Sequence, residues 1–149
     1  MIRHFHEQLE QAKINLLRMF ALADKFLDGA VTAFLERDRA AARELIYLDD
    51  ELDELENWLD DACLKMLALD QPVAADLRYI VATMRLSTDI ERIGDETSGL
   101  AQQTTLLTGL DDVENLPSME KLALLAKKML RTSVDSFRNA DAGLAREVF

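Results

Sequence analysis

Four acidic residues, arranged as two pairs with the same spacing, are the strongest chemical signal in the sequence. Asp49 and Asp53 are four residues apart, and so are Glu91 and Asp95. Residues four apart on a helix point the same way, so each pair would present two carboxylates on one face. Like charges at that spacing destabilise a helix by roughly a few tenths of a kcal/mol. The two pairs therefore indicate a site that uses gathered negative charge.

The position of the two pairs around Pro72 predicts that they meet. Proline disfavours helix in the residue before it, so Pro72 should separate two helices joined by a short turn, which pack as antiparallel neighbours. Asp53 precedes Pro72 by 19 residues and Glu91 follows it by 19. Asp49 and Asp95 each lie 23 residues from the same proline. We therefore expect Asp53 to face Glu91, and Asp49 to face Asp95.

Four carboxylates at one level need a counter-charge, because they cannot all stay ionised side by side. Arginine or a metal ion could supply it. An all-oxygen site suits hard cations such as Mg²⁺, Mn²⁺ or Ca²⁺, and iron is a further candidate. Gly94 carries no side chain and would leave room for a cation or for a closely approaching helix. The predicted metal ligands are Asp49, Asp53, Glu91 and Asp95.

Other charged residues of the same two helices are weaker candidates. Additional ligands or supporting groups could come from Glu56, Asp60, Arg78 and Arg92. For the two arginines the alternative is a surface salt bridge. For the carboxylates the alternative is a solvated acidic face, which is our interpretation of Asp50, Glu54 and Asp61. Trp58 is interpreted as a packing residue.

The sequence lacks the patterns of several catalytic classes. His4 and His6 are two residues apart, so they do not share a helix face. There is no Glu-x-x-His pattern of a ferritin-like di-iron core, no glycine-rich phosphate loop and no plausible Ser/His/Asp set. A metal-dependent hydrolase or oxidase would need a substrate pocket, of which the sequence gives no sign. We expect a protein without catalytic residues, with a purely structural bundle as the alternative to a binding function.

Composition narrows the class of protein further. The chain has 149 residues, 49% of them apolar, which suffices for a domain with a sizeable core. Its net charge of −11 argues against binding nucleic acid and against docking on anionic lipid. The one cysteine, Cys63, lies in a helical pattern and is interpreted as a small buried thiol. Because no signal segment and no apolar run of about 18 residues occurs, we expect a cytoplasmic protein without membrane insertion.

Apolar residues recur every three or four positions, which is typical of helical bundles. This spacing predicts helices over residues 3–36, 39–69, 73–107 and 119–138. Asp38 is the expected N-cap of the second helix, and residues 108–118 are the expected linker. The predicted fold is all-α, with a three-helix bundle over residues 1–107 and a fourth helix that begins an incomplete second bundle over 119–149.

The end of the chain repeats part of its beginning. Residues 122–149 align without gaps on residues 19–46, with an offset of 103. Ten of the 28 aligned positions are identical: Leu22/Leu125, Ala23/Ala126, Lys25/Lys128, Leu27/Leu130, Val31/Val134, Phe34/Phe137, Asp38/Asp141, Ala42/Ala145, Arg43/Arg146 and Glu44/Glu147. We expect a fragment or truncated form of a two-bundle protein. The apolar stripe of its fourth helix would fold back on the first bundle or pair with another chain as a homodimer.

Three stretches of the sequence together resemble the PhoU family. They are Asp49-Asp50-Glu51-Leu52-Asp53-Glu54-Leu55-Glu56, Gln71-Pro72-Val73-Ala74-Ala75-Asp76-Leu77-Arg78 and Asp89-Ile90-Glu91-Arg92-Ile93-Gly94-Asp95. The resemblance covers essentially the whole chain. It implies two tandem three-helix bundles and multinuclear metal clusters, iron or zinc among them, held by paired Glu/Asp-x-x-x-Asp motifs. Asp49/Asp53 and Glu91/Asp95 match those motifs.

The resemblance also implies a regulatory function. It suggests a cytoplasmic adaptor that represses the phosphate-starvation response and phosphate uptake. The implied partners are a phosphate-sensing histidine kinase and the ATPase of the phosphate ABC transporter. The implied cofactor is a divalent or trivalent metal, with iron, zinc, magnesium and manganese as candidates. The sequence departs from the family's pattern by ending early. It lacks the second motif pair, on which a second metal cluster and any function needing both bundles would depend.

Overall fold

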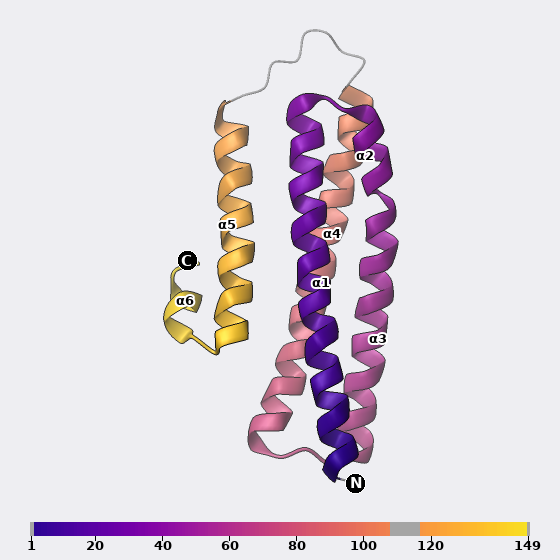
Figure 1. The fold of residues 1–149 in the computed structure, drawn as a ribbon, viewed down its shortest axis with the longest axis vertical. Coiled ribbons are helices and arrows are strands. Elements are labelled where there is room, and N and C mark those ends of the chain that lie inside the picture. Colours follow the sequence, from indigo (N-terminus) through magenta and orange to yellow (C-terminus); the bar gives the residue numbers. More distant parts are fainter. Residues whose placement is uncertain (1, 108–116, 149) are drawn as a thin grey trace. The chain divides into compact units, whose positions relative to one another are not determined.

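The computed structural model describes residues 2–107 and 117–148, and these residues form helices without any strand. The helices follow one another in the order α1 (Ile2–Glu36), α2 (Arg39–Leu45), α3 (Tyr47–Leu69), α4 (Ala74–Leu107), α5 (Pro117–Asn139) and α6 (Ala142–Arg146) (Figure 1). The predicted all-α class is confirmed. Within the described residues, no helix combines the length and the apolar character needed to span a membrane.

The predicted helices match the observed ones closely, with one exception. The helix predicted over residues 39–69 is split at Ile46 into α2 and α3. Ile46 forms a one-residue turn with helical dihedral angles, φ −59° and ψ −30°, so the interruption is a local distortion of the helix. No glycine or proline marks it in the sequence, and the spacing of apolar residues continues through it. The predicted linker lies outside the described residues, except that its last two residues, Pro117 and Ser118, begin α5.

The chain divides into two compact units that do not coincide with the predicted repeat boundary. The first unit holds Met1–Ala23 and Tyr47–Glu96, and the second holds Asp24–Ile46 and Thr97–Phe149. The long helices α1 and α4 each contribute residues to both units. A boundary between the units therefore falls inside continuous helices, where no break in the sequence pattern could reveal it.

The core of the first unit is built from residues at helical spacing on α1, α3 and α4. Those with no exposed surface are Leu16, Met19, Leu52, Leu59, Cys63, Met66, Ile80, Thr83 and Ser87. The predicted burial of Cys63 is confirmed, and burial, together with the charge of Asp60, raises the pKa of its thiol to about 11. A thiol with so high a pKa stays protonated and behaves as a small apolar group.

The end of α1 is set by a local backbone motif in the second unit. Arg37 takes the left-handed conformation, with φ 56°. Its N–H donates to the carbonyl of Phe34 at 3.3 Å, and the N–H of Asp38 donates to the carbonyl of Ala33 at 2.9 Å. This pair of bonds is a Schellman motif, which satisfies the last carbonyls of a helix. The Asp38 side chain then accepts from two N–H groups at the start of α2, which confirms the predicted N-cap.

The same motif recurs 103 residues later. Ala140 takes the left-handed conformation, with φ 51°. The N–H of Ala140 donates to Phe137 at 3.2 Å, and that of Asp141 donates to Ser136 at 2.9 Å. Asp141 caps α6 as Asp38 caps α2, accepting from Gly143 and Leu144. The repeat found in the sequence is therefore also a repeat of backbone structure.

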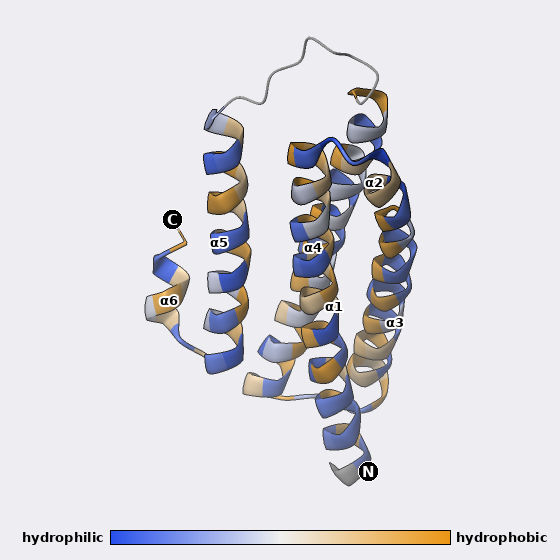
Figure 2. Cartoon of the chain, turned by 45° about the horizontal axis from the view of Figure 1, so that its top comes forward, coloured by the Kyte–Doolittle hydropathy of each residue, from blue (hydrophilic) through white to orange (hydrophobic). Residues whose placement is uncertain are grey.

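Helix α5 is amphipathic, with hydrophobic residues along one side (Figure 2). Leu130 is buried, but other large apolar residues are about half exposed or more: Leu122 62%, Leu124 65%, Leu125 57% and Met129 49%. Within the second unit, Arg131 forms a bidentate pair with Asp24, at 2.8 and 3.1 Å, and Lys127 pairs with Asp28. The predicted apolar stripe of this helix is thus covered only in part within the chain.

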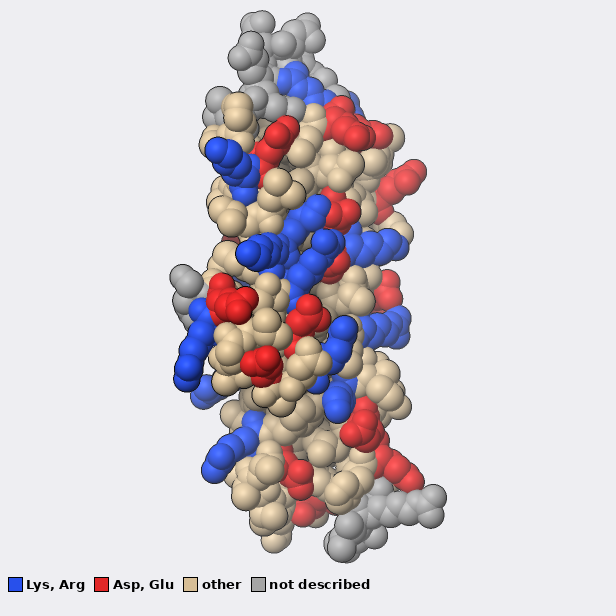
Figure 3. Space-filling model, turned by 60° about the vertical axis from the view of Figure 1, so that its left-hand side comes forward, with Lys and Arg blue, Asp and Glu red and all other residues tan. Residues whose placement is uncertain are grey.

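Charged residues of both signs cover the surface. On the face shown in Figure 3, basic and acidic side chains are interspersed. The net charge of −11 is therefore not expressed there as one continuous acidic surface.

Helices α3 and α4 approach each other closely at Gly94, which is buried. A Cβ atom at this position would lie 2.6 Å from Cδ1 of Leu52 and 3.4 Å from Oδ1 of Asp49. Leu52 has no exposed surface, so its methyl group has little space into which it could move. The absence of a side chain at Gly94 is therefore required by the packing of the two helices.

We predict that Gly94→Ala is less stable than the matched variant Gly99→Ala by about 1–3 kcal/mol, the usual cost of overpacking a core. Gly99 lies on the same helix, and a Cβ there would meet nothing within 4 Å. Both substitutions gain about 1 kcal/mol of helix propensity, so their difference isolates the contact with Leu52. The measurement is the free energy of unfolding in urea, followed by circular dichroism. Equal stabilities would show that α3 and α4 have room to spare at this level.

Candidate metal centre

The turn between α3 and α4 is built as the sequence predicts. Helix α3 ends at Leu69 and α4 begins at Ala74, so four residues including Pro72 connect them. The two helices run in opposite directions (Figure 1). Gln71 and Ala74 have positive φ angles of 49° and 41°, which let the chain reverse within this short span. The turn places the two acidic pairs on neighbouring helices.

Glu91 has the most informative environment of the four predicted ligands. Its pKa is raised from 4.5 to about 7, first by burial and then by the charge of Asp95. The charges of Glu56 and Asp53, and a hydrogen bond that the protonated Glu91 carboxyl donates to Asp95, raise it further. Every one of these causes favours the neutral form of Glu91. The structure thus brings four carboxylates from α3 and α4 close enough to repel one another.

Asp49 reaches the same level from α3. Its Oδ1 atom lies 3.4 Å from the position that a Cβ of Gly94 would occupy, and Asp95 is the next residue along α4. Asp49 and Glu91 are partly buried, whereas Asp53 and Asp95 are exposed. We call the strip between α3 and α4 that carries Asp49, Asp53, Glu91 and Asp95 the acidic seam. This seam is open to solvent on one side, which would allow an ion to enter.

The carboxylates do not form a ready coordination shell. In residues 2–107 and 117–148, no group of three or more His, Cys, Asp or Glu side chains is placed so as to hold a metal ion. Electrostatic repulsion acts over longer distances than metal–oxygen bonds of about 2.0–2.6 Å, so the two observations are compatible. Binding would require the side chains to turn into other staggered rotamers. The ligand set Asp49, Asp53, Glu91 and Asp95 stays a prediction.

The four weaker candidates separate into different environments. Glu56 acts on Glu91, and Asp60 acts on the buried thiol of Cys63 instead. Arg78 and Arg92 are exposed, and in the described part of the chain neither forms an ion pair within 4.0 Å. The surface salt bridges considered for these arginines are therefore not formed. Neither Arg78 nor Arg92 therefore supplies a counter-charge to Glu91.

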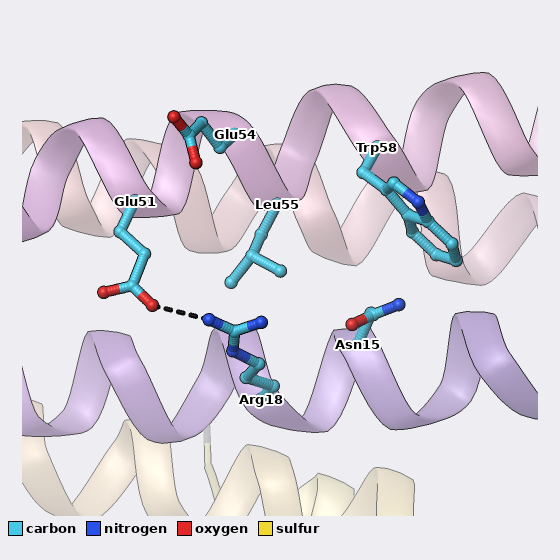
Figure 4. Close-up of a pocket in the computed structure, with 6 residues that line it drawn as sticks. All are labelled: Asn15, Arg18, Glu51, Glu54, Leu55 and Trp58. Carbon is cyan, nitrogen blue, oxygen red and sulfur yellow. Dashed lines mark hydrogen bonds and ion pairs between the residues drawn. The ribbon is translucent and has the colours of Figure 1, made fainter.

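One feature that the sequence reading missed is a pocket between α1 and α3 (Figure 4). Its lining residues are Asn15, Arg18, Glu51, Glu54, Leu55 and Trp58. Trp58 was interpreted as a packing residue, and 42% of its surface is exposed. The sequence contains one sign of this pocket. The spacing of Glu51, Glu54 and Trp58 puts them together on the face of α3 opposite the acidic seam.

These features define the class of protein: an all-helical bundle with a carboxylate-rich seam between two antiparallel helices. The family model described as "PhoU domain" matches residues 16–104. The chain therefore belongs to the PhoU domain family.

Relatives and a solved structure agree with this assignment. The chain is 31% identical to the phosphate-specific transport system accessory protein PhoU homolog of Pseudomonas putida, over 98% of this chain and 57% of that protein. It is 32% identical to the protein of the same name from Pseudomonas aeruginosa, over 98% of this chain and 61% of that protein. The crystal structure of PhoU from Pseudomonas aeruginosa matches with a TM-score of 0.92 and 31% identity, over 96% of this chain and 69% of that one. The chain spans about three fifths of the length of these two relatives.

We predict that the metal-free protein loses stability as the pH rises through 7. The folded state holds the Glu91 proton with a pKa of about 7, against the ordinary value of 4.5. This contribution is therefore fully present below pH 4.5 and is lost above pH 7. Glu91→Gln cannot ionise, so at pH 8 it should be more stable than the unaltered protein by about 1 kcal/mol.

The measurement is urea unfolding at pH 5 and pH 8 with a chelator present. The matched control is Glu96→Gln, which removes an exposed carboxylate from the same helix. It should keep the pH dependence of the unaltered protein. If Glu91→Gln keeps the same pH dependence as well, the carboxylates at this level do not repel one another.

Proposed function

We propose that this chain is part of a non-enzymatic adaptor that regulates phosphate transport. The observation that carries the proposal is alignment over 98% of the chain with proteins named as accessory to the phosphate-specific transport system. The chain spans 57% and 61% of those relatives, so the proposal concerns the share of the activity that lies in this segment. An adaptor binds partners through its surface, and the half-exposed apolar residues of α5 are suited to such contacts.

The proposed partners are a phosphate-sensing histidine kinase and the ATPase of the phosphate ABC transporter. Through them the adaptor would repress the phosphate-starvation response and phosphate uptake in the cytoplasm. A homodimer, in which a second copy covers the apolar side of α5, is part of the same proposal. These assignments rest on the family resemblance, and the exposed side of α5 supports the last of them.

A metal ion between α3 and α4 is the second part of the proposed function. Asp49, Asp53, Glu91 and Asp95 would hold it, with Glu56 beside them. Two observations support this fit: carboxylates of the two helices repel one another at this level, and neither Arg78 nor Arg92 forms an ion pair with another described residue. Iron, zinc, magnesium and manganese are the candidate metals. When bound, the ion would neutralise the seam and tie α3 to α4.

We predict that the protein binds Mn²⁺ and that Asp49→Asn with Asp53→Asn abolishes this binding. Binding to the folded state alone should stabilise the unaltered protein by about 2.7 kcal/mol at a hundred times Kd. The matched control replaces two exposed carboxylates of the same helix, Asp50→Asn with Asp61→Asn, and changes the net charge equally. The measurements are isothermal titration calorimetry and thermal unfolding. Equal binding by both double variants would place the ion elsewhere.

The adaptor proposal has a separate test. We predict that the purified protein binds the purified transporter ATPase and the sensor kinase from the same organism, measured by surface plasmon resonance with and without metal. The double variant Asp49→Asn with Asp53→Asn shows whether the seam matters to binding. Unchanged binding would make the seam a structural feature of the adaptor. Failure to bind either partner would refute the adaptor.

A further inference from the structure

The pocket between α1 and α3 has one ion pair and one carboxylate that stands apart from it. Nη2 of Arg18 donates to Oε1 of Glu51 at 2.7 Å, and both side chains are partly exposed. Glu54 is exposed, and its side chain makes no ion pair or hydrogen bond with another described residue. The three charges sum to −1, because Arg18 and Glu51 neutralise each other. The pocket therefore favours a cation over an anion.

An exposed indole lies one helical turn further along α3, and in the structure the Glu54 carboxylate points away from it (Figure 4). Trp58 follows Glu54 by four residues on α3, so both side chains lie on one side of the helix. Its side chain reaches from α3 towards α1, where Asn15 lies (Figure 4). Leu55 is 7% exposed and provides an apolar floor. Trp58 is 42% exposed, and the face of an exposed indole can bind a cation.

The size of the pocket limits what it can hold. Its volume is about 270 Å³. Pockets for whole small molecules usually span about 300–1,000 Å³, so this space suits a single side chain of a partner. A guanidinium group fits the available chemistry better than an ammonium group. It is planar, it stacks on an indole, and it can pair with a carboxylate through two hydrogen bonds.

The pocket is independent of the acidic seam. Asp49, Asp53 and Glu56 follow one stripe of α3, and Glu51 and Trp58 lie roughly opposite, given about 100° of rotation per residue. A ligand in the pocket would therefore bind whether or not the seam holds a metal ion.

We propose that this pocket is a docking site for an arginine side chain on a protein partner. The guanidinium stacks on Trp58, and the exposed Glu54 side chain turns to another staggered rotamer to pair with it. Asn15 offers its amide oxygen as a further acceptor. Because Glu51 pairs with Arg18 and neutralises its charge, Arg18 does not repel the bound guanidinium. The site recognises one residue, so it would add specificity to a larger interface.

Trp58 is the one tryptophan of the chain, so its fluorescence reports directly on the pocket. The experiment titrates the full chain, at constant ionic strength, with the blocked peptide acetyl-Gly-Arg-Gly-amide. Two control peptides replace arginine by citrulline, which has the same shape without the charge, or by lysine. We expect a saturable change with the arginine peptide, with Kd on the order of 10 mM for one side chain. The citrulline peptide should give no such change, and the lysine peptide should bind more weakly.

Two variants locate the site. Glu54→Gln should weaken binding of the arginine peptide by about fivefold or more. Asp50→Asn removes an exposed carboxylate of the same helix outside the pocket and should leave binding unchanged. The proposal is overturned if the arginine peptide gives no saturable change, if citrulline binds equally, or if the two variants behave alike. Equal binding of the lysine peptide would overturn the assignment to arginine.

Discussion

The close packing of α3 on α4 is the constraint on which the acidic seam depends. Leu52 is fully buried against a position where α4 has no side chain, because that residue is Gly94. Apolar burial of this kind is the main favourable term in folding, and it fixes the level at which the helices meet. The carboxylates lie on the same turns as these packing residues. They are therefore held together by an interaction in which they take no part.

Repulsion among these carboxylates is relieved when Glu91 keeps its proton. Glu91 is partly buried, and its pKa rises to about 7, which keeps a proton available near neutral pH. That proton can be shared with Asp95 through a hydrogen bond. A bound cation would relieve the same repulsion without the proton, so protonation and the proposed metal binding would compete at this seam.

Much of this architecture could be predicted from the sequence, and particular residues show why. Apolar spacing located the long helices to within a few residues, because each helix must bury one stripe. Asp38 signalled a cap through its own side chain, and symmetry around Pro72 placed the acidic pairs on facing helices. Other features depend on how two helices lie against each other. The exposure of Trp58 and the pocket beside it arise from the register of α1 against α3, which no single helical pattern contains. The interruption at Ile46 likewise has no local signal.

The two Schellman motifs, which end α1 and α5, have a consequence for how such a chain could arise. Each motif consists of hydrogen bonds among a few neighbouring backbone groups, followed by one capping aspartate. It requires no contact with residues distant in the sequence. A duplicated segment would therefore carry its own helix-ending motif. The new helix would end at the same position as the original, even before other residues had evolved to pack against it. Duplicating a helix with its end intact is then easy in this fold. Evolving a surface that packs against the duplicated helix is the harder step.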